Sequence, residues 1–164
     1  MDWKEALKAI LDESLKRRGD LVLIGIGSPL RGDDGVGVRI ANMLRKVVKH
    51  DRVKVLVLED RVDLLPKALK KLNPAVLLFF DAADFGGRPG EIILMSLPES
   101  SGKTISTHEI PLELIIKVSG VRSPVYVIGV QVMSLEFGGD LSPAIKAAGD
   151  EIVGFLQEIL SSNL

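Results

Sequence analysis

Hydrophobic residues follow two patterns along this chain, short apolar runs and longer stretches with a helical period. The short runs end at glycine, proline or charged residues and predict β-strands, because strands buried on both faces carry apolar residues at consecutive positions. These runs cover residues 21–27, 53–60, 75–81, 91–97 and 125–132. The run at 75–81 is the most hydrophobic and is expected at the centre of a sheet.

The stretches between these runs repeat apolar residues every three or four positions, which predicts amphipathic helices. Helices are expected over residues 2–18, from Asp33 onward, over 61–72 and 110–119, and from Ser142 to near the end. The apolar face of the first contains Trp3, Leu7, Ile10, Leu11 and Leu15. The inward residues expected in the second are Val36, Ile40, Met43, Leu44 and Val47.

The order of these elements predicts the fold class. Strands that alternate with helices form a three-layer α/β/α sandwich around a mostly parallel sheet. The connection between 75–81 and 91–97 is too short for a helical crossover, so the strand at 91–97 is expected to be antiparallel. We expect five strands in the order 2-1-3-5-4. Residues 1–164 are expected to form one domain, with 1–18 as an additional N-terminal helix.

Composition limits the chemistry that the chain can perform. The net charge is −1, which disfavours a nucleic-acid-binding protein because such a protein needs a basic face. The chain contains no cysteine, so disulfides, thiolate nucleophiles and cysteine-ligated metals are excluded. Any metal site must therefore use carboxylate and imidazole groups.

The apolar segments also bear on localisation. The first ten residues carry charges throughout and do not resemble a signal peptide. The longest apolar run, Ala75 to Phe80, is far too short to span a bilayer. We therefore expect a cytoplasmic protein without membrane insertion.

Adjacent acidic residues lie in a glycine-rich loop after the first strand, GIGSPLRGDDGVG at 25–37. A dinucleotide fingerprint would need glycine at Leu30, and a P-loop would need lysine at Asp33, so neither phosphate-binding motif is present. We interpret Asp33 as the cap of the next helix. Asp34 is the candidate for chemistry, because one cap is enough and its glycine neighbours leave it room to face outward.

Two further polar positions follow other apolar segments. Asp81 ends the most hydrophobic strand, where an ionised side chain is costly unless it has a partner, whereas Asp84 is interpreted as a turn residue. Of the two histidines, His108 precedes the helix that Pro111 starts, and His50 is interpreted as a cap at the end of the second helix.

These positions converge if the first and third strands are neighbours. Sites in open α/β sheets lie at the carboxyl ends of the strands, where the direction of winding reverses. Asp34 and Asp81 would flank that crevice, and Asp33 and Asp84 would lie outside it or at its rim. Two carboxylates and the imidazole of His108 could bind zinc, nickel or a similar ion and leave coordination positions open.

The ordered segments GIGSPLRGDDGVG, DAADFGGRPGE, THEIPLE and GGDLSPAIKAA resemble the nickel–iron hydrogenase maturation endopeptidases. This resemblance covers about residues 21–150 and implies an α/β/α sandwich with a mixed five-stranded sheet, of the phosphorylase/hydrolase-like kind. It implies removal of a C-terminal peptide from the precursor of the hydrogenase large subunit after nickel is installed. The catalytic and metal-contacting residues of the family fall on Asp34, Asp81 and His108. One departure is Ser28, where the family usually has asparagine.

The resemblance leaves the mechanism open. In one version the three residues contact nickel that the precursor supplies, so that the free protein holds little metal. In another the two aspartates share a proton, as in aspartic proteases. A nickel-binding chaperone that does not cut the precursor, and a Ser28–His108–Asp81 hydrolase, are the rival functions. We expect a monomer, with a weak dimer as the alternative.

Overall fold

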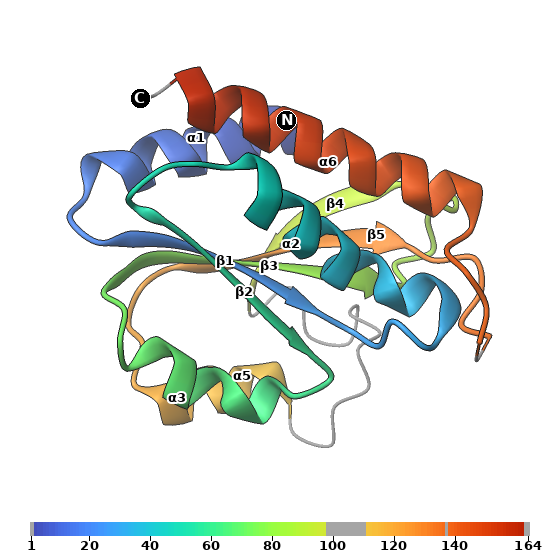
Figure 1. Cartoon of the computed structure of the whole chain (residues 1–164), viewed down its shortest axis with the longest axis horizontal. Coiled ribbons are helices and arrows are strands. Elements are labelled where there is room, and N and C mark those ends of the chain that lie inside the picture. The colour runs from blue at the N-terminus through green and yellow to red at the C-terminus, as the bar shows by residue number, and fades with distance from the viewer. Residues whose placement is uncertain (1, 98–110, 137, 163–164) are drawn as a thin grey trace.

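The computed structural model describes residues 2–97, 111–136 and 138–162. A five-stranded sheet lies between two layers of helices, as Figure 1 shows. The strands are β1 (Asp20–Ile26), β2 (Val53–Glu59), β3 (Pro74–Ala83), β4 (Ile92–Ser96) and β5 (Val125–Gln131). Their order is β2-β1-β3-β5-β4, and only β4 runs antiparallel to its neighbour. The predicted sandwich, strand order and antiparallel strand are confirmed.

The helices cover the two faces of the sheet unequally (Figure 1). Helices α1 (Trp3–Lys16), α2 (Val36–Val47) and α6 (Pro143–Ser162) lie on one face, and α3 (Leu65–Leu69) and α5 (Leu112–Ser119) on the other. Short 3-10 turns, η1 (Gly32–Gly35) and η2 (Val62–Leu64), precede α2 and α3. No helix of the described ranges is long and apolar enough to cross a bilayer.

The alternation of side chains along β3 separates two hydrophobic cores. Leu78 and Phe80 belong to the core under α1, α2 and α6, whereas Leu77 and Phe79 belong to the core under α3 and α5. All four are fully buried, which explains why the central strand is apolar at consecutive positions.

Helix α1 packs on the sandwich through its apolar face. Leu7 and Leu11 are fully buried, and the Trp3 ring meets Phe155 of α6 edge-on, with 5.4 Å between ring centroids. Its start is capped by Asp2, whose Oδ1 accepts a hydrogen bond from the Glu5 amide at 2.8 Å. The helix is therefore fixed at its start and along its length.

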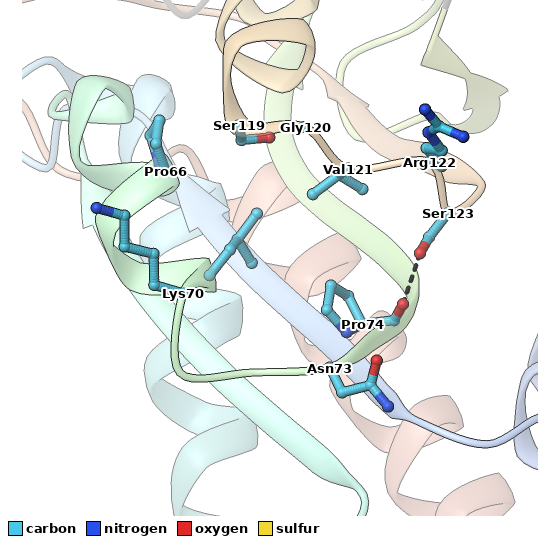
Figure 2. Close-up of a pocket in the computed structure, with 10 residues that line it drawn as sticks. Pro66, Lys70, Asn73, Pro74, Ser119, Gly120, Val121, Arg122 and Ser123 are labelled. Carbon is cyan, nitrogen blue, oxygen red and sulfur yellow. Dashed lines mark hydrogen bonds between the residues drawn. The ribbon is translucent and has the colours of Figure 1, made fainter.

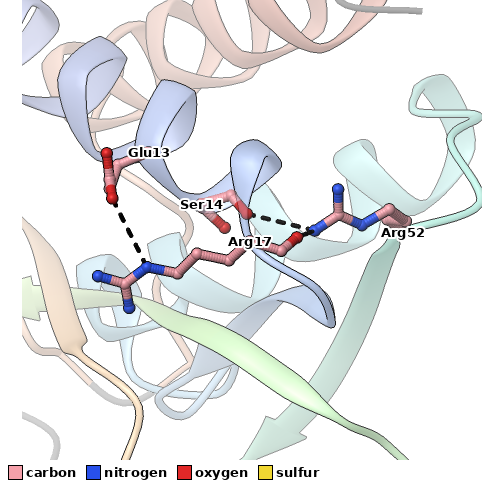
Figure 3. Close-up of polar contacts among 4 residues, drawn as sticks. All are labelled: Glu13, Ser14, Arg17 and Arg52. Atoms are coloured by element: carbon pink, nitrogen blue, oxygen red, sulfur yellow. Dashed lines mark hydrogen bonds and ion pairs between the residues drawn. The ribbon is translucent and has the colours of Figure 1, made fainter.

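The C-terminal end of α1 is held by Arg52 (Figure 3). The Arg52 guanidinium donates to the carbonyl oxygens of Leu15 at 2.6 Å and Gly19 at 2.9 Å, and also to those of Ser14 and Arg17. The Ser14 carbonyl also accepts from the Arg17 amide, and the planar Arg52 guanidinium, in the turn before β2, supplies further donors where the helix ends.

Two details of the predicted helices were wrong. The helix expected over 61–72 is a 3-10 turn followed by the short α3. Pro66 has no N–H to donate to the Val62 carbonyl, so the first turn cannot form α-helical bonds. Val47, expected to face inward, is 36% exposed at the last position of α2.

Candidate functional site at the carboxyl edge of β1 and β3

Two glycines allow α2 to lie directly on the sheet. A Cβ atom at Gly37 would lie 2.1 Å from the Phe80 carbonyl oxygen, and one at Gly25 would lie 2.5 Å from Cβ of Ala41. Neither position can carry a larger side chain without moving the backbone. This close approach fixes the loop between β1 and α2, including η1, over the ends of β1 and β3.

The Asp34 carboxylate is buried in this loop, with only 2% of the residue exposed. Its Oδ2 accepts a hydrogen bond from the Ser28 amide at 3.0 Å. Its Oδ1 is also buried but accepts no hydrogen bond from any described residue. The expectation that Asp34 faces outward was therefore wrong. A buried carboxylate oxygen without a donor costs about 1–3 kcal/mol or more, so this oxygen is suited to accept from a ligand or to contact a cation.

Asp81 lies on the neighbouring strand at the same edge. It follows Phe80, which pairs with Gly25 of β1, and it is completely buried. Its Oδ1 accepts a hydrogen bond from the Ala82 amide at 2.8 Å. Because side chains alternate along β3, Asp81 lies on the same face as Phe79, toward α3 and α5. The structure thus places Asp34 and Asp81 at the carboxyl ends of adjacent parallel strands.

His108 lies outside the described residues. Within the part of the chain that the structure describes, no three histidine, aspartate or glutamate residues form a group that could hold a metal ion. The second histidine, His50, does not cap α2 as predicted, because the helix ends at Val47. Its Nδ1 instead accepts a hydrogen bond from the Arg52 amide at 3.1 Å, in the turn before β2.

Asp33 does not cap α2, which corrects the sequence interpretation. It is completely buried and joins the loop between β1 and α2 to the segment between β5 and α6. Four groups donate to its carboxylate: the Met133 amide at 2.9 Å, the Ser134 amide at 2.8 Å, and the amide and hydroxyl of Ser142 at 2.7 and 3.0 Å. The Asp33 amide returns a hydrogen bond to the Ser134 carbonyl at 2.9 Å.

This hydrogen bonding also determines the ionisation of Asp33. Burial alone would raise its pKa, but the hydrogen bonds from Ser142, Ser134 and Met133 together outweigh burial and lower the pKa below the usual aspartate value. Asp33 is therefore a carboxylate that holds two loops together, and Asp34 beside it is the one with an unused oxygen.

Gln131 organises the loop after β3 and was not singled out from the sequence. Its Oε1 accepts hydrogen bonds from the amides of Phe85 at 2.9 Å and Gly87 at 3.1 Å, and its Nε2 donates to Asp84 at 3.2 Å. Asp84 also accepts from the Gly86 amide, so its interpretation as a turn residue is confirmed. The available signal was a polar residue at the end of the apolar run 125–132.

Ser28 has a local structural role. Its Oγ accepts a hydrogen bond from the Leu30 amide at 3.3 Å, and its amide donates to Asp34. The serine thus shapes the turn that buries Asp34. This geometry gives no support to Ser28 as a nucleophile.

A hollow at the opposite edge of the sheet is not a comparable site (Figure 2). It has a volume of about 380 Å³ and lies where β3 and β5 begin. The Ser119 hydroxyl donates to the Ile116 carbonyl and the Ser123 hydroxyl to the Pro74 carbonyl. The side chains of Lys70 and Arg122 extend away from each other. Its polar groups complete local backbone structure and do not converge on a ligand.

The chain is similar to hydrogenase maturation proteases in sequence and in structure. That family matches residues 38–160. A putative hydrogenase maturation protease of Methanocaldococcus jannaschii is 29% identical, over 94% of this chain and 96% of that protein. The hydrogenase 3 maturation protease of Escherichia coli is 28% identical, over 80% of this chain and 85% of that protein.

Solved structures agree with this relationship. The [NiFe] hydrogenase maturation protease HycI of Thermococcus kodakarensis superimposes with a TM-score of 0.78 and 29% identity, covering 93% of this chain and 99% of that chain. The endopeptidase HycI of Escherichia coli gives a TM-score of 0.71 and 26% identity, over 85% and 90% of the two chains. The chain therefore belongs to the hydrogenase maturation protease family and is a peptidase.

Proposed function

We propose that this peptidase removes a C-terminal peptide from the precursor of a nickel–iron hydrogenase large subunit, after nickel has been inserted. The observation that carries the proposal is the buried Oδ1 of Asp34, which accepts no hydrogen bond from the described residues and lies at the strand edge shared with Asp81. A cation brought by the substrate would give that oxygen its partner.

The donor set fits such a cation. Asp34 and Asp81 offer carboxylate oxygens, and His108 would add an imidazole nitrogen, a combination suited to nickel or zinc. These are few ligands for a divalent ion, so the free protein would bind it weakly and the precursor would supply the rest. In this proposal nickel is part of the substrate. The ion would provide Lewis-acid polarisation of the scissile carbonyl.

The chain's own residues then have separate tasks. Peptide hydrolysis requires a base that takes a proton from water and an acid that returns one to the leaving amine. Asp34 or Asp81 would serve as that base. Asp33 would keep the loop in place through its contacts with Met133, Ser134 and Ser142.

A two-aspartate mechanism is the alternative for the same reaction. Asp34 and Asp81 are both buried at the same edge of the sheet, which is the placement that a pair of acidic catalytic residues would need. The two-aspartate mechanism gives His108 no role, and for that reason we favour the version with nickel.

The proposal is tested by producing the protein together with the large-subunit precursor of its own organism in the cytoplasm of a host that inserts nickel. Intact-mass analysis should show that the precursor loses a C-terminal peptide. A precursor that remains uncut with the wild-type protein, although it carries nickel, would refute the proposal and favour the nickel-binding chaperone. Asp34→Asn should leave the precursor uncut, and Asp20→Asn, which changes a carboxylate at the opposite edge, should not.

A further inference from the structure

A groove runs from the loop between β1 and α2, which carries Asp34, along α2. It has a volume of about 790 Å³ and lies between α2 and the segment that leads into α6. Gly32 and Gly35 line it next to Asp34, and Lys46 lines it near the end of α2. From Gly35 to Lys46 the helix rises roughly 16 Å, the length of about five residues of extended chain.

The lining of this groove is basic. Arg39, Lys46 and Lys146 contribute three cations, and Asp140 contributes one carboxylate. Arg39 pairs with Asp150 at 3.3 Å, outside the lining. Among the described residues, neither lysine has a carboxylate within ion-pair distance. The net charge of the whole chain is −1, so this is a local concentration of positive charge.

Arg39 also has an unused hydrogen-bond donor. Its Nε is buried and donates to none of the described residues. A buried donor of this kind favours an acceptor supplied by a ligand. Val38, Met43 and Leu141 add apolar lining, which suits the aliphatic parts of a peptide better than the phosphates of a nucleic acid.

We infer that this groove binds an acidic, extended segment of the protein substrate, about five residues long and close to the scissile bond. The inference rests on the proposed function, which supplies the substrate. Its physical basis is the continuity of the groove with the loop that carries Asp34, together with its charge. Cations lining the groove steer an acidic segment toward the site and hold it in register.

The main test compares two double variants with the same change in charge. Lys46→Glu/Lys146→Glu reverses the groove, and Lys70→Glu/Arg122→Glu reverses two exposed cations at the opposite edge of the sheet. With nickel-loaded precursor as substrate, the groove variant should raise KM roughly tenfold and leave kcat within about twofold, and the control should change neither. The KM of Lys46→Gln/Lys146→Gln, which removes the two charges without reversing them, should lie between that of the wild type and that of the reversed variant.

Salt provides a further readout of the same variants. The wild-type KM should rise with sodium chloride, because salt screens exposed charges, and the KM of the groove variant should be nearly independent of it. Equal KM values for the groove variant and its control would overturn the inference.

A binding measurement separates the groove from the cleavage reaction. A fluorescent hexaglutamate peptide should bind the wild-type protein and the control variant at low salt, and binding should be lost in the groove variant, whereas hexalysine should bind none of them. This result would support the groove even if the precursor were never cut. Equal binding of hexaglutamate by all three proteins, or no binding by the wild type, would contradict it.

Discussion

The two edges of the parallel sheet are formed by the same strands but use polar side chains differently. At the amino edge, the Ser123 hydroxyl bonds to the Pro74 carbonyl and the Asp20 carboxylate accepts from the Asn73 amide, both in partly exposed positions. At the carboxyl edge, Asp34 and Asp81 are buried. Polar groups at the first edge complete local structure, whereas the second edge keeps a carboxylate oxygen that the described structure does not use.

The largest effect is expected from two carboxylates at opposite edges of the sheet, Asp34 in the loop after β1 and Asp20 at the start of β1. Asp34→Asn removes the anionic oxygen but keeps the shape, and it should slow precursor processing by roughly 10³-fold or more. Asp20→Asn should change the rate by less than about twofold, because an amide oxygen can still accept from Asn73. Single-turnover processing followed by intact mass measures both. If Asp34→Asn retained substantial processing activity, the carboxyl edge would not be functionally distinct from the amino edge.

Asp33 should dominate stability at the carboxyl edge. Asp33→Ala leaves three partly buried backbone amides and a hydroxyl without their acceptor, and it should lower the free energy of unfolding by about 4 kcal/mol. The sequence interpretation as a simple cap implied a much milder effect. Urea unfolding measures the free energy of unfolding of Asp33→Ala. Asp140→Ala, which removes an exposed carboxylate, is the control. A loss below about 1 kcal/mol would show that the two loops are held by other contacts.

The stabilisation from Asp33 should depend on pH in a defined direction. Its pKa is lowered in the folded protein, so its contribution is complete above the unfolded-state pKa of about 3.9 and is lost as the pH falls through the lower folded-state value. The stability difference between wild type and Asp33→Asn should therefore be constant near neutral pH and shrink below about pH 4. A difference that grows on acidification would contradict this assignment.

Alanine substitutions at two helical glycines separate the effect of close packing on the sheet from the effect of helix propensity. Gly37→Ala should destabilise the protein by about 3 kcal/mol, because the new Cβ would collide with the Phe80 carbonyl. In Gly154→Ala, in α6, the new Cβ would meet no atom of the described residues within 4 Å outside its own turn of helix, so this change should stabilise by about 0.5–1 kcal/mol. Thermal unfolding of both variants measures these two changes in stability. Equal effects would mean that α2 can move away from the sheet.

The smallest effect concerns α1, which lies away from the site. Arg52→Ala removes the donor for the last carbonyls of the helix and should cost about 2 kcal/mol of stability without changing the rate of processing. Arg18→Ala, an exposed arginine nearby, is the control and should be close to neutral. If Arg52→Ala slowed processing at a temperature at which the variant is still folded, α1 would contribute to substrate recognition.

Most of the fold could be predicted because it depends on local patterns. Strands buried on both faces require consecutive apolar residues, and the short connection after β3 required an antiparallel β4. The helix at 61–72 was overpredicted, because periodicity does not register the missing N–H of Pro66.

The candidate site was predictable only in part. Asp34 and Asp81 stand out because charged residues rarely follow apolar strands. The role of Asp33 could not be found this way, because its partners Met133, Ser134 and Ser142 are about 100 positions away along the chain. The sequence assigned a structural role to Asp33 and chemistry to Asp34, but only the tertiary structure shows which contacts Asp33 makes.

We propose that the carboxyl edge of the sheet recognises a nickel-bearing precursor. The most direct measurement incubates the purified protein with nickel-loaded and nickel-free forms of the same precursor and follows the intact mass of each. We predict cleavage of the nickel-loaded form only, and little metal bound to the protein before it is mixed with the precursor. Equal cleavage of both forms would contradict nickel recognition and favour the two-aspartate mechanism at Asp34 and Asp81.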